Sequence, residues 1–218
     1  MAKRGNYAAG RIRRQQILEA ATLHFAQNGY YATSLASIAR DIDITTAGLM
    51  HHFPTKQHLL VALADHRIET IGSWAREMGT DEDGLEFWRV AVEMSRRMTA
   101  KPGLIELFVV VAFSAADPAS PIHDLYSERY EMVVKKHAVH YYSGIERGVF
   151  RPDINGEELA RECIAVVDGL QLQWALSKGA LDLAAATRRH HEQQLRSIVT
   201  PGVVVDLSPR PRTSKTRR

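Results

Sequence analysis

The side chains of this sequence that could carry out acid–base, nucleophilic or metal chemistry form no complete catalytic pattern. His191-Glu192 begins like the helix of a zinc protease, but the second histidine of that motif is missing. His137 and His140 lie one helical turn apart, which permits metal ligation, yet a histidine pair without further ligands is more typical of a structural role. Cys163 lies in an apolar stripe and is expected to pack rather than to react.

Motifs of the common enzyme classes are also missing from the sequence. It contains no G-x-S-x-G nucleophile elbow, no Walker A loop and no G-x-G-x-x-G dinucleotide-binding turn. We therefore predict no catalytic residue, no bound metal and no cofactor, and a small helical enzyme is the less favoured alternative.

A second group of polar side chains, between residues 34 and 56, has the chemistry needed to bind a polyanion. Hydroxyl, imidazole and ammonium groups donate hydrogen bonds to phosphate oxygens. The candidate donors in this segment are Ser34, Thr46, His51, His52 and Lys56. The alternative interpretation is that the two histidines pack at a helix end and that the lysine is simply solvated.

The distribution of charge along the chain also suits a polyanionic partner. Residues 1–60 carry seven Lys or Arg and three Asp or Glu, residues 61–208 carry 16 and 22, and residues 209–218 carry five and none. Two basic ends around an acidic middle favour contact of the ends with a polyanion. An ordinary solvated surface with a basic tail would have the same charges.

Two short helices separated by a tight turn would position the candidate donors. Ser34 is a good N-cap for a helix over Leu35–Ile42, whose apolar residues recur at helical spacing. Asp43-Ile44 forms the turn, and Thr45 caps the next helix, which spans about Thr46 to His52.

Longer helices are predicted on both sides of this pair. The first begins at Arg11 and stops at Asn28-Gly29, because both residues tolerate the left-handed conformation of a helix C-terminus. Phe53-Pro54 ends the second short helix, and a long helix then runs from Lys56 to about Met78. Two short helices between longer ones form a helix-turn-helix arrangement, which predicts DNA binding.

The second short helix has the side chains that a major groove would accept. A helix that enters the groove needs small or polar outward side chains, and Thr45, Thr46, Ala47 and Gly48 meet this need.

The whole segment resembles the DNA-binding segment of the tetracycline-repressor (TetR) family of bacterial regulators. Residues 29–60 read GYYATSLASIARDIDITTAGLMHHFPTKQHLL, with Thr-Ser before an Ile-Ala pair, a tight turn, and a Leu-x-His-His-Phe-x-x-Lys block followed by Leu-Leu. The block and its distance from the first short helix make the motif specific when it is taken whole. The resemblance covers about residues 11–65, and beyond them only the all-helical layout is similar.

This resemblance implies a role for each matching position. Thr46 and Ala47 would face base edges, and Ser34 would add a phosphate contact assisted by the helix N-terminus. The expected phosphate contacts are Ser34, Thr45, His51, His52, Lys56 and the basic arm of Arg11, Arg13 and Arg14.

Two positions depart from the family pattern. The family usually has glycine in the turn, where this chain has Asp43, and Asp adopts the left-handed conformation at modest cost. The family often has tyrosine where this chain has Met50, so a phosphate-directed hydroxyl is lost. We expect Met50 to contact a sugar face or a thymine methyl group instead.

Beyond residue 80 every segment is predicted to be helical. Asp81–Thr99 is apolar on two sides, as expected of a helix inside a bundle, and further helices are predicted over residues 102–116, 121–148, 157–177 and 182–198. Val109–Val111 would also suit a strand, but no second strand is evident for it to pair with.

The predicted fold is therefore all-α, with about nine helices. A helix-turn-helix head over residues 11–60 is linked by a long helix to a helical bundle over residues 61–200, which we expect to bind a ligand and to dimerise. A basic arm over residues 1–10 and a basic tail over residues 201–218 are predicted to be disordered.

By resemblance, the last two helices would form the interface of a homodimer. The candidate contacts are Val166, Leu170 and Trp174, with packing inside one subunit as the alternative. A symmetric dimer would read a palindrome in successive major grooves, because one short recognition helix reads too few base pairs.

Also by resemblance, a small, largely apolar molecule would enter the bundle and release the DNA. The candidate lining residues are Trp88, Met94, Met98, Phe108, Tyr126, Tyr130 and Trp174. The alternative for each of them, which the residue types favour, is plain core packing.

We thus expect a DNA-binding transcriptional regulator of the repressor kind that recognises a palindromic operator as a homodimer. A constitutive DNA-binding protein without a ligand is the main alternative. The single cysteine fits a cytoplasmic protein, and no apolar run is long enough to span a bilayer, so no membrane partner is predicted.

Overall fold

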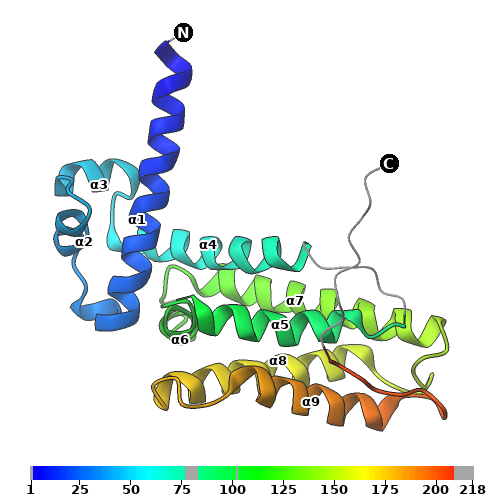
Figure 1. The fold of residues 1–218 in the computed structure, drawn as a ribbon. Coiled ribbons are helices and arrows are strands. Elements are labelled where there is room, and N and C mark those ends of the chain that lie inside the picture. The colour runs from blue at the N-terminus through cyan, green and yellow to red at the C-terminus, as the bar shows by residue number, and fades with distance from the viewer. Residues whose placement is uncertain (1, 77–82, 102, 209–218) are drawn as a thin grey trace. The chain divides into compact units, whose positions relative to one another are not determined.

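The computed structural model describes residues 2–76, 83–101 and 103–208, and these residues form nine α-helices (Figure 1). The helices are α1 (Ala2–Ala32), α2 (Leu35–Asp41), α3 (Thr46–His52), α4 (Lys56–Arg76), α5 (Glu86–Ala100), α6 (Leu104–Ala115), α7 (His123–Glu146), α8 (Gly156–Leu176) and α9 (Leu183–Ile198). Over the same residues the only β-type pairing is an isolated bridge between Phe150 and Val199. The all-α prediction is confirmed, and Val109–Val111 is helical within α6.

The chain divides into two compact units. Unit 1 contains the chain up to Ile71 together with Lys101–Ser127, and unit 2 contains Gly72–Ala100 together with the chain from Glu128 onward. The long helices α4 and α7 therefore each contribute residues to both units.

Local capping explains why unit 1 has two short helices at residues 35–52. The Ser34 hydroxyl accepts a hydrogen bond from the Ser37 N–H at 3.0 Å, and the Ser37 Oγ accepts one from the Ser34 N–H at 3.3 Å, which completes a capping box. Thr45 caps α3 in the same way. Asp43 adopts a φ of +53°, the left-handed conformation that we expected of it in the turn.

The core of unit 1 joins α1 to α6 as well as to α2. Ile17, Leu18 and Phe25 of α1 are almost completely buried, and so are Ile38 and Leu49 of the two short helices. Helix α6 packs directly against α1.

A buried arginine links α4 to α6 inside unit 1. The Arg67 side chain is only 8% exposed, its Nε donates to the Leu104 carbonyl oxygen at 3.4 Å, and its guanidinium lies 4.5 Å from the centre of the Phe108 ring. Gly103 precedes α6 with a φ of +76°, and a Cβ there would come within 3.2 Å of Ala26. The entry of α6 is therefore fixed by contacts to both α1 and α4.

Unit 2 is built around aromatic residues from α5 and α7. Trp88 and Tyr141 have no exposed surface, and the Trp88 ring meets the rings of Tyr141 and Phe150 edge to face at 5.1 and 5.3 Å. Helix α9 packs against both α5 and α8, which lie beside it in Figure 1. Leu195 and Ile198 extend this core into α9.

The structure corrects two predicted boundaries of regular structure. Helix α1 begins at Ala2 rather than Arg11, and it continues to Ala32 across a non-helical residue at Gly29, where we had placed its end. The tail does not start at residue 201, because Leu207 is buried in the core of unit 2. Residues 209–218 of the predicted tail lie outside the described residues.

A long-range contact explains the ordered segment before residue 209. Arg89 of α5 donates to the Asp206 carbonyl oxygen at 3.1 and 2.7 Å, and its remaining N–H groups bind both oxygens of the Asp83 carboxylate at 2.8 and 2.6 Å. The Asp83 and Glu86 carboxylates outweigh the effect of burial and raise the pKa of Arg89 further.

None of the described helices is by itself long and apolar enough to cross a membrane. Helices α5 and α6 would reach the necessary length and composition only if they were taken together across the break between them.

Candidate nucleic-acid interface

Helix α3 buries one side chain and exposes the side that we predicted to meet DNA. Leu49 has no exposed surface and anchors the helix in the core of unit 1. Thr46, Ala47 and Gly48 are exposed, and so is Met50, with 45% of its surface accessible. A row of small side chains beside one flexible thioether is compatible with close approach to the edges of bases.

Thr45 links the start of α3 to this exposed face. Its Oγ1 accepts a hydrogen bond from the Gly48 N–H at 3.0 Å, so the hydroxyl proton remains available for donation to an external oxygen. A Cβ at Gly48 would lie 3.2 Å from the same Oγ1. Glycine at this position therefore keeps the cap undistorted as well as the surface small.

Basic side chains of α1 lie beside the C-terminal histidines of α3. The guanidinium of Arg14 lies 5.1 Å from the centre of the Phe53 ring, directly after α3. Burial is the largest cause that lowers the pKa of His52, and the charges of His51, Arg14 and Arg13 lower it further. These groups therefore form a region of positive potential, which favours an anion.

Lys56 is held in place by the segment that precedes α2. Its Nζ lies 4.4 Å from the centre of the Tyr30 ring and donates to the Tyr31 carbonyl oxygen at 3.2 Å. Partial burial lowers the pKa of Lys56. The ammonium group has three N–H bonds, so one contact to the backbone leaves others for a phosphate.

Two features of this surface were not predicted from the sequence. Tyr30 and Tyr31 position Lys56, and the ring of Tyr31 is 94% exposed. His24 of α1 binds the Asp41 carboxylate of α2 at 2.7 Å, which ties the two helices together. The aromatic pair Tyr30-Tyr31 is visible in the sequence. No local sequence rule, however, predicts that Tyr31 contacts a lysine 25 positions later.

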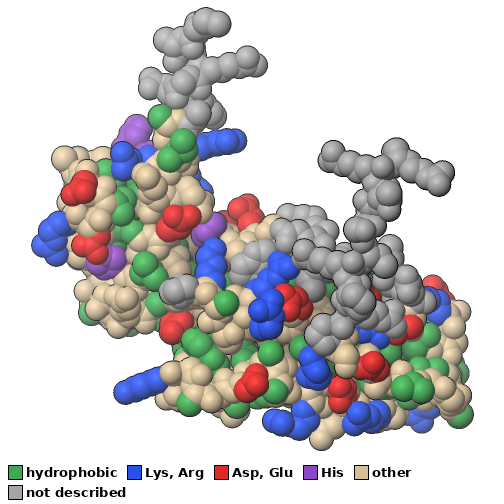
Figure 2. Space-filling model, in the orientation of Figure 1, with side chains coloured by type: hydrophobic (Ala, Val, Ile, Leu, Met, Phe, Trp, Pro, Cys, Tyr) green, Lys and Arg blue, Asp and Glu red, His purple; other side chains and the backbone are tan. Residues whose placement is uncertain are grey.

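The predicted DNA-contacting residues thus fall in one unit of the chain, on α1, α2, α3 and the start of α4. Arg11, Arg13 and Arg14 are all exposed on α1, and Ser34 is exposed at the start of α2. Figure 2 shows basic and histidine side chains over this part of the molecule, with acidic side chains among them. Contact with DNA at these positions stays a prediction.

The predicted ligand-lining residues are distributed over both units. Phe108 and Tyr126 lie in unit 1, whereas Trp88, Met94, Met98, Tyr130 and Trp174 lie in unit 2. Trp88 belongs to the aromatic core described above, which favours the alternative of plain packing for this residue. Tyr130 of α7 donates a 2.5 Å hydrogen bond to the Asp168 carboxylate of α8, so the two helices share a polar contact.

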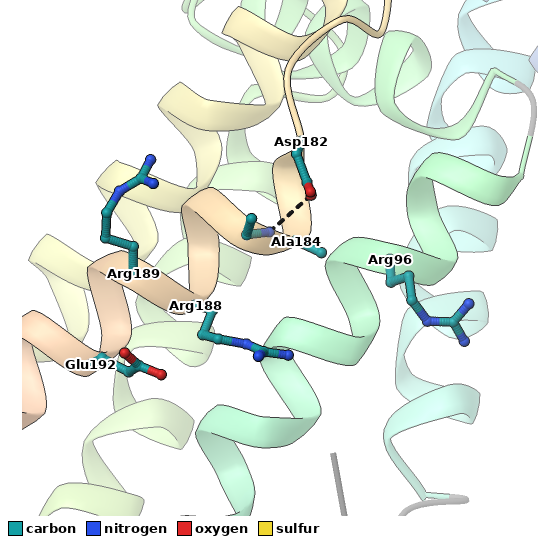
Figure 3. Close-up of a pocket in the computed structure, with 7 residues that line it drawn as sticks. Arg96, Asp182, Ala184, Arg188, Arg189 and Glu192 are labelled. Atoms are coloured by element: carbon teal, nitrogen blue, oxygen red, sulfur yellow. Dashed lines mark hydrogen bonds between the residues drawn. The ribbon is translucent and has the colours of Figure 1, made fainter. Parts of the chain in front are cut away.

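One pocket of unit 2 lies between α5 and α9 and is charged rather than apolar (Figure 3). It has a volume of about 490 Å³ and is lined by Arg96, Asp182, Ala184, Ala185, Arg188, Arg189 and Glu192. In Figure 3, Asp182 caps the start of α9 through a hydrogen bond to the Ala185 N–H. None of the predicted lining residues belongs to this pocket.

The candidate dimer residues lie along one helix of unit 2. Val166 is 37% exposed on α8, while Leu170 and Trp174 are partly buried. Their partial exposure is compatible with a further contact partner, and their part in a dimer stays a prediction.

Comparison with known families accounts for most of the chain. The family model of bacterial regulatory proteins of the tetR family matches residues 17–63, and that of the C-terminal domain of BetI-type transcriptional repressors matches residues 105–200. The chain belongs to the TetR family. The resemblance that we drew from residues 29–60 is confirmed, and this TetR-family chain is a transcriptional regulator.

Similar proteins agree with this assignment. The HTH-type transcriptional regulator BetI of Burkholderia ambifaria is 27% identical over 187 residues, which cover 83% of this chain and 91% of that protein. A transcriptional regulator from Saccharomonospora viridis, solved in complex with choline, has a TM-score of 0.75 at 24% identity and covers 87% of this chain and 99% of its own. The SmeT–triclosan complex has a TM-score of 0.76 at 19% identity and covers 91% of this chain and 97% of its own.

Proposed function

We propose that this TetR-family protein is a repressor that binds a palindromic operator as a homodimer and releases it when a small molecule binds. The observation that carries the DNA-binding part is the exposed face of α3 formed by Thr46, Ala47 and Gly48, on a helix whose C-terminal His52 is near Arg13 and Arg14 of α1. The family model that matches residues 105–200 is that of BetI-type transcriptional repressors, which supports the proposal that this protein represses transcription.

In this proposal α3 lies in the major groove. Thr46, Ala47, Gly48 and Met50 face the base edges, where the groove carries sequence information. Phosphate oxygens receive hydrogen bonds from Ser34, Thr45, His51, His52, Lys56, Arg11, Arg13 and Arg14. Phosphate contacts fix the register of the helix, and base contacts select the sequence.

A second copy of the chain completes the operator complex. A symmetric dimer places two recognition helices about one turn of DNA apart, so that each reads half of a palindrome. We propose α8 and α9 as its interface, with Val166, Leu170 and Trp174 as contacts. The exposed part of Val166 is apolar surface that a partner would cover.

A small-molecule effector is supported by similar proteins. The Saccharomonospora viridis regulator binds choline and SmeT binds triclosan, so regulators with this fold accept both a small cation and an apolar aromatic compound. We propose that the effector of this chain binds among the helices of unit 2 that contribute Met94, Met98, Tyr130 and Trp174.

The test is to select fragments of the source genome with the purified full chain and to sequence them. We expect a palindromic motif, two chains per site by sedimentation, and loss of binding when an effector is added. Choline and triclosan are the first compounds to add, followed by a screen of apolar and aromatic metabolites by thermal shift. A non-palindromic motif bound by one chain would overturn the proposal, and release by no compound would favour the constitutive alternative.

A further inference from the structure

Three side chains with metal-binding atoms converge inside unit 2. Cys163 of α8 and the adjacent His190 and His191 of α9 each offer one ligand atom, and these atoms all lie within 4.8 Å of one another. The Cys163 Sγ is 3.7 Å from the His191 Nδ1. Cys163 lies 28 positions before His191 in the sequence, so it is the packing of α8 against α9 that brings the cysteine to the two adjacent histidines.

Burial makes this cluster unusual among the polar groups of the chain. His191 has no exposed surface, and Cys163 is 2% exposed. The Nε2 atoms of His190 and His191 are both buried, and no described residue offers either of them a hydrogen-bond partner. Polar atoms that lose water on folding without gaining a partner destabilise a protein, so such atoms usually have a bound partner.

The geometry is close to that of a tetrahedral zinc site. A thiolate at ~2.3 Å and an imidazole nitrogen at ~2.0 Å from Zn²⁺ lie roughly 3.5 Å apart in such a site. The distance from Sγ to Nδ1 in this chain is 3.7 Å, and the ligand atoms of all three side chains lie within 4.8 Å of one another. We propose that Cys163, His190 and His191 form a buried binding site for Zn²⁺.

The donor set determines the class of ion. One thiolate and two imidazoles suit Zn²⁺, whereas Mg²⁺ and Ca²⁺ require oxygen ligands, which these three side chains do not supply. Binding displaces one proton, that of the Cys163 thiol, because the imidazoles coordinate in their neutral form. The fourth position would be open to water.

Zn²⁺ at this site would join α8 to α9. These two helices already pack against each other, and the ion would add coordination bonds that connect residue 163 to residues 190 and 191. The site does not depend on the proposed operator or effector, so it can be tested without either of them.

The experiment uses the tag-free full chain, stripped of metal with a chelator and titrated with Co²⁺ as a spectroscopic probe for Zn²⁺. We expect one ion per chain, a thiolate-to-cobalt absorption band in the near ultraviolet, and visible bands typical of tetrahedral Co²⁺. Zn²⁺ should displace the probe and raise the thermal midpoint.

Variants assign the ligands. Cys163→Ser should abolish the thiolate band, and His191→Gln should weaken binding by roughly tenfold or more, because even partners outside the first coordination shell contribute that much. The matched control is His58→Gln at an exposed position of α4, which should bind the probe like the parent chain.

Alkylation of the cysteine tests the site even where a variant does not fold. Zn²⁺ should slow the reaction of Cys163 with a maleimide in the parent chain, because the sulfur would be coordinated. The absence of a thiolate band, a band that persists in Cys163→Ser, or alkylation at the same rate with and without Zn²⁺ would each overturn the proposal.

Discussion

In the proposed operator complex, Thr46 is the residue on which sequence recognition would depend most directly. It is the first residue of α3 and is exposed beside the cap formed by Thr45. We predict that Thr46→Glu abolishes operator binding, because a carboxylate at this position would be repelled by the phosphates and would fill the space for the base edges. Binding is measured by fluorescence anisotropy.

Two comparisons show whether such a loss is local. Thr46→Ser should retain most of the affinity, and Ser127→Glu, which adds the same charge to an exposed position of α7, should leave it unchanged. A folded and dimeric Thr46→Glu protein with full affinity would remove Thr46 from the interface.

Lys56 is predicted to contact a phosphate rather than a base. Lys56→Ala should weaken binding to all sequences by a similar factor and lower the slope of log affinity against log salt by about one per lost phosphate contact, so by about two for the proposed dimer. Lys136→Ala, at an exposed position of α7, is the control and should leave the slope unchanged. An unchanged slope for Lys56→Ala would mean that the amine only positions Tyr30 and Tyr31.

His52 should make operator binding dependent on pH. Burial and the neighbouring positive charges lower its pKa below the ordinary value of 6.5 in the free protein, and a phosphate contact would raise this pKa. The complex then binds more protons than the free protein, so affinity rises as the pH falls from about 7.5 toward 6, by at most about tenfold per pH unit for each of the two His52 side chains in the proposed dimer.

The variant His52→Gln separates this histidine from the others. It should flatten the dependence of affinity on pH, whereas His58→Gln should not. The same pH dependence in the parent chain and in His52→Gln would contradict a contact between His52 and a phosphate.

At the scale of helices, α7 packs closely against the segment that follows it. Replacing Gly144 of α7 with alanine, which adds one methyl group, tests this packing. A Cβ at Gly144 would lie 2.1 Å from an atom of the Phe150 ring, which is buried in the core of unit 2. Gly144→Ala should therefore lower the free energy of unfolding by roughly 1–3 kcal/mol or more, as overpacking does elsewhere.

Gly10→Ala is the matched control in urea unfolding. Gly10 lies in α1, and a Cβ there meets no atom within 4 Å. Alanine has the higher helix propensity, so this variant should be about 0.5–1 kcal/mol more stable than the parent. Equal stability of Gly144→Ala and the parent chain would show that Phe150 moves aside without cost.

Helix boundaries could be predicted from the sequence where local chemistry sets them. Ser34 and Thr45 cap α2 and α3, so the observed spans 35–41 and 46–52 agree with the prediction to within one residue. The resemblance of residues 29–60 to the TetR family also predicted that Thr46 and Ala47 face outward from α3, and both are exposed. Contacts within a few residues are visible in a sequence because they follow the period of the helix.

Contacts between distant residues could not be predicted. Arg89 binds the Asp206 carbonyl oxygen, 117 positions later, and this contact orders a segment that we had expected to be a tail. Lys56 and Tyr31 are 25 positions apart. Each side chain alone is typical of a solvated surface, and only the packed fold shows its partner.

For the whole molecule, regulation requires that the bundle influence the head. The chain passes between the two units after Ile71, Ala100 and Ser127, and the first and last of these crossings lie inside α4 and α7. A helix transmits a rotation or a shift more directly than a flexible linker does. Arg67 then joins α4 to α6 within unit 1, so a change in either helix affects the other.

The most direct test of the proposed function measures operator and effector binding on the same protein. A compound that thermal shift shows to bind should lower operator affinity by roughly 5- to 150-fold, and saturating operator should lower the affinity for the compound by the same factor. Anisotropy gives the first quantity and calorimetry gives the second. Equal factors are the predicted result, and an operator affinity that stays the same when the bundle is saturated with the compound would contradict ligand-controlled repression.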